Sequence, residues 1–246
     1  MKFLIQKIEN QIQHDFSFTL LESVRFHDWL QNDTHSTIKY INCKYDDNGI
    51  LQLPVFKKYH HTYIPIGSVE FVSQFLNTFY GLTPKPRNVP ESLFSYAGRG
   101  IFNGNETNIP DKHVFVKSND VIKGYSQVFQ NGIETLDVSK GNYQISDYIN
   151  IDSEWRTFVY KNKLVGLQHY VGEFTMFPDV RRIKEMIESF TDSPIAYTLD
   201  VGINNTETFV IEVHDFFSCG LYGFSDHSIL PSMFSRWFHE YISKNN

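Results

Sequence analysis

The sequence is poor in cysteine, in long apolar runs and in N-terminal targeting features. Its two cysteines, Cys43 and Cys219, stand alone, and neither a disulfide framework nor a cysteine-based zinc site can be built from them. No apolar stretch approaches the roughly 18–20 residues that a transmembrane helix needs. The N-terminus lacks the apolar region and small-residue cleavage site of a signal peptide. We therefore expect a soluble, cytoplasmic protein without membrane contacts.

The chain also lacks an excess of positive charge. Its formal net charge is −6, whereas a general nucleic-acid binder is more often basic, so we expect no such binding. The histidines are scattered at spacings that match no zinc site, which makes a hydrolytic metalloenzyme a poor interpretation. No Ser-His-Asp or Cys-His set is recognisable either. The 246 residues are 41% hydrophobic, which suits one large globular domain or two small ones.

Three prolines mark the clearest boundary in the chain. Pro84, Pro86 and Pro90 fall within seven residues and predict a linker. We therefore predict an N-terminal α/β unit over residues 1–88 and a second region over 89–246. Within the first unit, residues 63–72 read as a strand, and the following spacing predicts a helix that ends at Gly81.

Antiparallel hairpins dominate the predicted second region. Residues 154–172 alternate β-forming side chains on both sides of a short turn. Residues 178–193 have the spacing of an amphipathic helix, and residues 98–107 read as a loop rich in Gly and Asn. Because a doubly wound parallel sheet would alternate strands and helices more strictly, the pattern favours an α+β fold with antiparallel sheets and packed helices.

Carboxylates end two neighbouring predicted strands. Asp200 lies near the end of one strand and Glu212 near the end of the next, across a short turn that would bring them together. Such a pair needs a divalent cation or an arginine, although ordinary surface salt bridges are an equal alternative. Strand alternation puts Glu212 and His214 on one face and Asp215 on the other, unless the strand bulges or ends there.

Several cations also occupy suggestive positions. Lys117 closes an apolar strand and Lys123 follows in a polar loop, where both suit phosphate oxygens, although ordinary surface lysines are the simpler interpretation. Glu154 and Arg156 share one face of a strand, as an internal ion pair or as ligands for a ribose hydroxyl and an anion. Arg99 lies between glycines, where backbone and guanidinium could both approach an anion.

The order of these pieces resembles the ATP-grasp superfamily. The segments IPIGSVEFV, VFVKS followed by IKG, SEWRTFV and IEVHDFFSCGLYG look closest to a small bacterial and phage clade of ATP-grasp domains, which is marked by an arginine and two lysines. The resemblance implies an ATP-grasp-like fold, in which antiparallel sheets and packed helices clamp ATP after a small N-terminal unit. It is good over residues 90–225 and thin over 1–85.

The resemblance also implies roles for particular residues. The adenine hinge would be Ser146, Asp147, Tyr148 and Ile149, with Glu154 on the ribose and Lys117 and Lys123 on the phosphates. Arg156 and Arg99 would bind the γ-phosphate or an acyl phosphate. Asp200 and Glu212 would hold Mg²⁺ together with His214 or Asp215. Because the family's usual Glu-x-Asn reads Glu-x-His here, Mn²⁺ is a further candidate.

The implied activity is ATP-dependent ligation of a small-molecule or peptide carboxylate to an amine, through an acyl phosphate and with release of ADP. A phosphotransferase on the same fold and a non-catalytic ATP-binding module are the alternatives. Arg181, Arg182 and Lys184 are candidates for the substrate carboxylate, although a solvated helix face explains them equally well.

Overall fold

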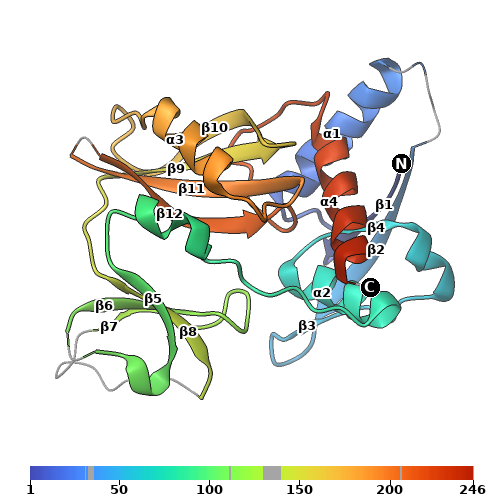
Figure 1. Ribbon diagram of the computed structural model, residues 1–246. Coiled ribbons are helices and arrows are strands. Elements are labelled where there is room, and N and C mark those ends of the chain that lie inside the picture. The colour runs from blue at the N-terminus through green and yellow to red at the C-terminus, as the bar shows by residue number, and fades with distance from the viewer. Residues whose placement is uncertain (31, 33–35, 111, 130–139, 206, 246) are drawn as a thin grey trace. The chain divides into compact units, whose positions relative to one another are not determined.

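The computed structural model describes residues 1–30, 32, 36–110, 112–129, 140–205 and 207–245. These residues form two compact units, whose ribbon is drawn in Figure 1. Unit 1 comprises Met1–Thr83, Pro194–Ala196 and Asp215–Asn246, and unit 2 comprises Pro84–Ser193 and Tyr197–His214. Each unit is described by itself below.

Unit 1 is built on a mainly parallel sheet with the strand order β3-β2-β1-β4. Strand β1 (Lys2–Ile8) pairs in parallel with β2 (Thr37–Tyr45) on one side and with β4 (Ile64–Ile66) on the other, and β3 (Leu51–Gln52) pairs antiparallel with β2. A central parallel strand is covered on both faces, which explains the continuous apolar start of the sequence. The predicted N-terminal α/β architecture is thereby confirmed.

Three helices complete unit 1: α1 (Asp15–Leu30), α2 (Val69–Tyr80) and α4 (Leu230–Asn245). Helix α2 begins where the Ser68 side chain accepts a hydrogen bond from the Phe71 amide, and it ends at Gly81, which has the left-handed φ of 67° typical of a C-cap. The predicted end at Gly81 is confirmed. The predicted strand over 63–72 is wrong beyond Ile66, because the Ser68 cap begins a helix whose buried residues follow helical spacing.

Unit 2 contains two four-stranded sheets. The first has the order β10-β9-β11-β12, and the second has the order β5-β8-β6-β7. The strands of the first sheet are β9 (Ser153–Tyr160), β10 (Lys163–Gly172), β11 (Ala196–Asn204) and β12 (Glu207–Asp215). The strands of the second are β5 (Ile101–Asn105), β6 (Val114–Ser118), β7 (Ser126–Phe129) and β8 (Asn142–Asp147). Short 3-10 helices are Lys58–Thr62 in unit 1, and Glu91–Tyr96 and Glu106–Asn108 in unit 2.

The antiparallel character predicted for this part of the chain is confirmed. Strands β9 and β10 form the expected hairpin, whose two turn residues Lys161 and Asn162 have φ values of 51° and 56°. Such left-handed pairs match the twist of the flanking strands. The loop predicted over 98–107 is wrong for Ile101–Asn105, which form β5 and pair with β8. Tertiary pairing there overrides the low strand preference of Gly and Asn.

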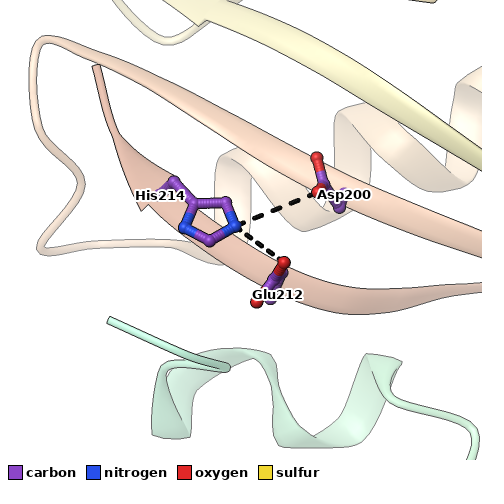
Figure 2. Close-up of side chains that lie close together, drawn as sticks. All are labelled: Asp200, Glu212 and His214. Atoms are coloured by element: carbon purple, nitrogen blue, oxygen red, sulfur yellow. Dashed lines mark ion pairs between the residues drawn. The ribbon is translucent and has the colours of Figure 1, made fainter. Parts of the chain in front are cut away.

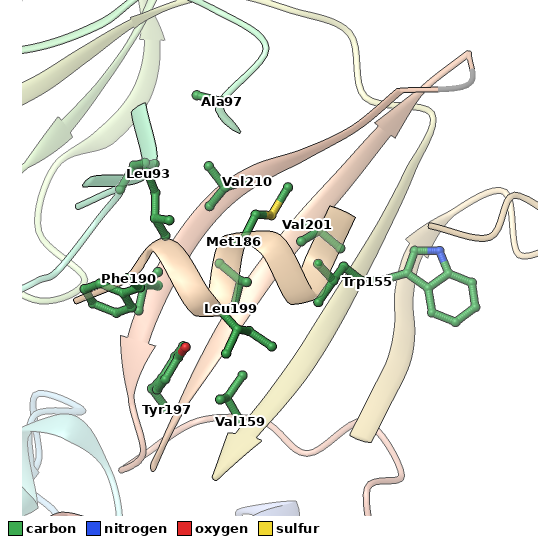
Figure 3. Packing of buried hydrophobic residues seen from close by; sticks show 14 of the residues in the cluster. Leu93, Ala97, Trp155, Val159, Met186, Phe190, Tyr197, Leu199, Val201 and Val210 are labelled. Atoms are coloured by element: carbon green, nitrogen blue, oxygen red, sulfur yellow. The ribbon is translucent and has the colours of Figure 1, made fainter. Parts of the chain in front are cut away.

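Helix α3 (Val180–Ser189) covers one face of the first sheet, as Figures 1 and 3 show. Its buried residues Ile183, Met186 and Ile187 pack with alternate residues of the strands, which include Trp155 and Val159 of β9 and Tyr197, Leu199 and Val201 of β11. Because side chains alternate along a strand, the residues between them point to the opposite face. Glu154, Arg156 and Asp200 therefore lie on the face away from α3.

The compact units differ from the predicted division at residue 88. Residues 215–246 cluster with unit 1, because α4 packs on α1 and β4 and buries residues that include Phe234 and Trp237. The ranges 1–88 and 89–246 stay a prediction about functional domains. Among the residues described, no helix combines the length and apolar character needed to cross a membrane.

Candidate functional site

A pocket of about 450 Å³ lies within unit 2 and is lined by both of its sheets. The second sheet and the segment that follows β8 supply Phe115, Lys117, Ser126, Val128, Gln144, Ser146, Asp147, Tyr148, Ile149 and Ile151. The first sheet supplies Glu154, Tyr170, Ile211 and Glu212, and Asn88 and Arg99 complete the lining. The pocket therefore has an apolar section and a section with several charged groups, as a site for a charged organic ligand requires.

Two carboxylates and an imidazole gather at the charged section. Asp200, Glu212 and His214 each offer one ligand atom, and these atoms all lie within 4.8 Å of one another (Figure 2). The His214 Nε2 atom is 2.7 Å from Glu212 Oε1 and 4.0 Å from Asp200 Oδ2. Oxygen and imidazole ligands of this kind suit Mg²⁺ or Mn²⁺.

Asp200 is held by a buried arginine. The Arg156 Nε and Nη2 atoms donate to the two Asp200 oxygens at 2.8 and 2.7 Å, and both side chains are almost fully buried. The Tyr170 hydroxyl donates to Glu154 Oε2 at 2.7 Å and lies 3.4 Å from Asp200 Oδ2. Arg156 thus forms an internal ion pair with Asp200 on the neighbouring strand.

Glu212 pairs with a lysine from the other sheet. The Lys117 Nζ atom lies against Glu212 Oε2, so this ion pair joins β6 to β12. Burial lowers the pKa of Lys117 to about 8, Asp200 opposes this change, and the cations Arg156 and Arg99 reinforce it. An anionic ligand in the pocket would stabilise the charged lysine, which gives the site an electrostatic preference for anions.

Arg99 binds main-chain carbonyls instead of a carboxylate. Its Nη1 atom donates to the oxygens of Ala97 and Val210 at 2.9 and 3.0 Å, and its Nη2 atom donates to the Ile211 oxygen at 3.4 Å. Burial lowers the pKa of Arg99 to about 10. These three hydrogen bonds go to neutral carbonyl groups, which do not cancel the positive charge of the guanidinium. Arg99 can therefore attract an anion into the pocket.

The predicted hinge follows the end of β8. Ser146 and Asp147 belong to the strand, and Tyr148 and Ile149 follow it. The Asp147 carboxylate already has two partners: one oxygen accepts from the Gly100 amide at 3.1 Å, and the other binds Lys112 Nζ at 2.5 Å. The Lys112 contact holds the pKa of Asp147 below its usual value. The tyrosine ring stacks on His113 with ring centres 4.1 Å apart.

Some predicted residues lie apart from this pocket. Lys123 is exposed, has a φ of 56° and is not among the lining residues. Arg182 lies over the Tyr96 ring and contacts Glu185, and Arg181 contacts Asp179 at the start of α3. These contacts support the interpretation of the start of α3 as a solvated helix face.

The strand β12 does not alternate strictly. Val210 and Val213 both belong to the apolar core, whereas the consecutive residues Ile211 and Glu212 both line the pocket. Two consecutive side chains on the same face of a strand are the effect that a β-bulge has. The structure groups His214 with Glu212 and Asp200 and does not place Asp215 in that group. Which of the two completes a metal site stays a prediction.

Tyr170, Gln144 and Asn88 are among the pocket residues that sequence reasoning missed. Tyr170 lies in the predicted hairpin, and its alternation with His169 was the available signal for the face it occupies. Gln144 and Asn88 carried no signal, because neither residue type is diagnostic alone. In the structure all three line the pocket, and their polar atoms bond to its other residues or to the adjoining backbone.

Comparisons with known proteins agree with this geometry. Residues 96–231 match the family model described as ATP-grasp domain, R2K clade family 2. A search of curated proteins finds no match.

Solved structures that resemble the chain include D-alanine–D-alanine ligase from Bacillus anthracis complexed with ATP, with 10% identity, a TM-score of 0.54, and coverage of 100% of this chain and 99% of that one. Another is a RimK domain ATP-grasp protein from Sphaerobacter thermophilus, with 12% identity, a TM-score of 0.53, and coverage of 99% and 100%. At these identities the likeness shows the fold, which is that of ATP-grasp proteins.

Proposed function

The chain belongs to the ATP-grasp domain family named R2K clade family 2, and from this premise we propose that it uses ATP to join a carboxylic acid to an amine. The observation that carries the proposal is the pocket of unit 2. There, Lys117 from one sheet meets Glu212 from the other, beside Asp200 and His214, and the hinge segment lines the same pocket. The proposal includes a cytoplasmic location, where ATP is supplied.

The nucleotide would lie with its adenine against the hinge. Phe115, Val128, Ile149 and Ile211 give that section apolar walls. Among the described residues, the main chain of Tyr148 and Ile149 has no hydrogen-bond partner, so its polar groups remain for an adenine edge. Glu154 would accept from a ribose hydroxyl, and Tyr170 would hold its carboxylate in place.

The phosphates would lie among the cations. Lys117 and Arg99 both line the pocket. Phosphate oxygens would take the place of Glu212 as the partner of Lys117, and of the main-chain carbonyls as the partners of Arg99. Lys123 would join from its loop. Arg156 reaches this section through Asp200 and would bind a γ-phosphate or acyl phosphate only by changing partners.

The chain's own residues fit a divalent cation. Two carboxylates and one imidazole present ligand atoms close together, and Arg156 and Lys117 pair with the two carboxylates in the free protein. His214 Nε2 must release its proton to act as a ligand. A bound Mg²⁺ or Mn²⁺ would supply charge neutralisation for the phosphate oxygens.

The proposed reaction needs no side-chain nucleophile. An oxygen of the substrate carboxylate attacks the γ-phosphorus, the bond to the β,γ-bridging oxygen breaks, and ADP leaves. The amine nitrogen then attacks the acyl carbon, phosphate leaves with the bonding electrons, and the nitrogen loses a proton. The protein contributes positioning and charge neutralisation through Lys117, Arg99 and Arg156.

Mass spectrometry of ADP-coupled turnover against pooled amino acids, peptides and other small carboxylic acids and amines tests the proposal. We expect ADP release only when both an acid and an amine are present, together with a condensation product whose mass is lower by one water than the sum of the two. A phosphorylated product without an amine would instead establish a phosphotransferase. Nucleotide binding without ADP release would establish a binding module, and the absence of any thermal shift with ATP and Mg²⁺ would refute the nucleotide site itself.

A further inference from the structure

Asn88 and Val89 connect the two sheets of unit 2. The sequence places them in a proline-rich linker, yet each is only 2% exposed, and Asn88 lines the pocket. A buried stretch of linker must satisfy its main-chain groups within the protein. The bonds that do so lead to both walls of the pocket.

The first connection is to β12, the strand that carries Glu212. The Val213 amide donates to the Asn88 carbonyl oxygen at 2.7 Å, in an antiparallel bridge between these two residues. Val213 lies between Glu212 and His214. Asn88 thereby bonds to the backbone of β12 between Glu212 and His214.

The second connection is to the strand that carries the lysine. Asn88 Nδ2 donates to the Ser118 carbonyl oxygen at 2.9 Å and to Asn119 Oδ1 at 2.6 Å. Ser118 directly follows Lys117. Because a carbonyl oxygen can only accept, the amide nitrogen of Asn88 must be the atom that faces it.

Val89 strengthens the attachment to the same sheet. Its amide donates to Gln144 Oε1 at 3.0 Å, and Gln144 Nε2 donates back to its carbonyl oxygen at 2.9 Å. Pro90 follows and favours an extended backbone at Val89. The two consecutive residues thus bond to β12 on one side and to β6 and β8 on the other.

The backbone of Asn88 explains the choice of residue. Its φ is 48°, in the left-handed region that Asn and Gly adopt more readily than other residues. Gly would permit this conformation but has no side chain to reach Ser118. Asp would tolerate it but would set a carboxylate oxygen against the Ser118 oxygen. Asn alone of these three meets both requirements.

We propose that Asn88 is a positioning residue of the ATP site, one that holds the backbone beside Lys117 in register with the backbone of Glu212 and His214. This inference rests on the proposed function. The direct Lys117–Glu212 contact is made by long side chains with several rotatable bonds, whereas Asn88 joins the two backbones through short bonds. Without that link the phosphate-binding lysine and the cation-binding acids can separate, and the charges they present to ATP no longer coincide.

The test compares Asn88→Gly and Asn88→Asp with the control Asn162→Gly. Asn162 has a similar left-handed φ of 56° and lies in the β9–β10 turn of the same unit. The affinity for ATP with Mg²⁺ is measured by calorimetry below the thermal transition of each variant. We expect about a tenfold or greater loss of affinity for both Asn88 variants, in the range of couplings between contacting residues, and less than about a twofold change for Asn162→Gly.

The outcomes separate this inference from the proposed function. If the wild type binds no ATP, the proposed function fails. If the wild type binds ATP and either Asn88 variant binds it with unchanged affinity, the positioning role is overturned. A purely structural role would lower the thermal stability of the Asn88 variants but leave the ATP affinity of the folded protein intact, and this result also overturns the inference.

Discussion

The two sheets that enclose the pocket differ in how they are supported. The β10-β9-β11-β12 sheet packs one face on α3, and its apolar cluster includes Met186, Leu199 and Val201 with no exposure (Figure 3). Among the described residues, the cluster of the β5-β8-β6-β7 sheet is smaller and is centred on Val114, Val116 and Ile145. The β10-β9-β11-β12 wall of the pocket thus packs on a large hydrophobic cluster, and the β5-β8-β6-β7 wall packs on a small one.

The two sheets also differ in how deeply their ion pairs are buried. Arg156 and Asp200 are 8% and 1% exposed in their side chains, whereas Lys112 and Asp147 are 57% and 43% exposed. A buried charge is costly unless it is paired, while an exposed pair contributes little. The first sheet thus holds Asp200 through a buried ion pair, whereas the pair beside the hinge of the second sheet is open to solvent.

The largest effect is expected from Arg156→Met, which leaves the Asp200 carboxylate buried without its main partner. We expect the free energy of unfolding of unit 2 to fall by about 3–5 kcal/mol, as measured by urea unfolding. The double variant Arg156→Met/Asp200→Leu is the control, and it should recover most of this loss because no buried charge remains. A single variant as stable as the wild type would contradict the buried-pair argument.

Leu199→Ala and Ile145→Ala compare the two apolar clusters directly. Both residues have no exposure, and deletions of this size cost about 2–5 kcal/mol. We expect Leu199→Ala to lie at the upper end, because packing by α3 prevents the cavity from collapsing, and Ile145→Ala to lie at the lower end. Denaturant unfolding followed by circular dichroism measures both, and the opposite order would remove the contrast between the sheets.

Lys117→Ala separates binding from stability. We expect ATP affinity to fall by about 10–100-fold, since a hydrogen bond to a charged group contributes about 1.5–3 kcal/mol. The thermal midpoint should change little, because the variant also removes a partly buried charge and Glu212 keeps its contact with His214. Lys163→Ala, an exposed lysine of β10, is the matched control and should bind ATP as the wild type does. Unchanged affinity in Lys117→Ala would refute its assignment to the phosphates.

The smallest effect is expected from Lys112→Ala, which removes the exposed partner of Asp147. Because the folded-state pKa of Asp147 is lowered from 3.8, the pair contributes stability above that pH and loses it as the pH falls through the folded-state value. We expect a difference below about 1 kcal/mol at pH 7 and none once Asp147 is protonated. Urea unfolding of the wild type and of Lys112→Ala across this pH range measures the difference in stability. A difference that does not depend on pH would contradict its assignment to the Lys112–Asp147 pair.

Several candidate site residues could be singled out because they interrupt apolar strand patterns. Lys117, Glu154, Asp200 and Glu212 are polar residues within β-forming runs, and such exceptions to the alternation are visible in a sequence. The β9–β10 hairpin and the end of α2 at Gly81 were predictable for the same local reason, since turn and cap residues act through the backbone nearby. The strand predicted over 63–72 extended into the start of α2, because the segment around Ser68 is compatible with both a strand and a helix.

Partners across the fold were not predictable. The sequence offered Glu154 as a partner of Arg156 on the same strand but did not indicate the bond to Asp200 on the neighbouring strand. Strand neighbours depend on the sheet order β10-β9-β11-β12, which no local pattern reveals. The link formed by Asn88 was hidden for the same reason, because its partners Ser118 and Val213 are distant in the chain.

Local sequence patterns thus predicted elements such as the β9–β10 hairpin and the end of α2, the charged residues within the strands, and a resemblance to the ATP-grasp superfamily that the family match bears out. These properties follow from side-chain alternation, capping and turn chemistry, which act over a few residues. The contacts of Lys117 with Glu212, of Arg156 with Asp200, and of Asn88 with both sheets depend on the tertiary fold. Those contacts arise when distant strands pair and pack, because burial then selects the partner for each charge.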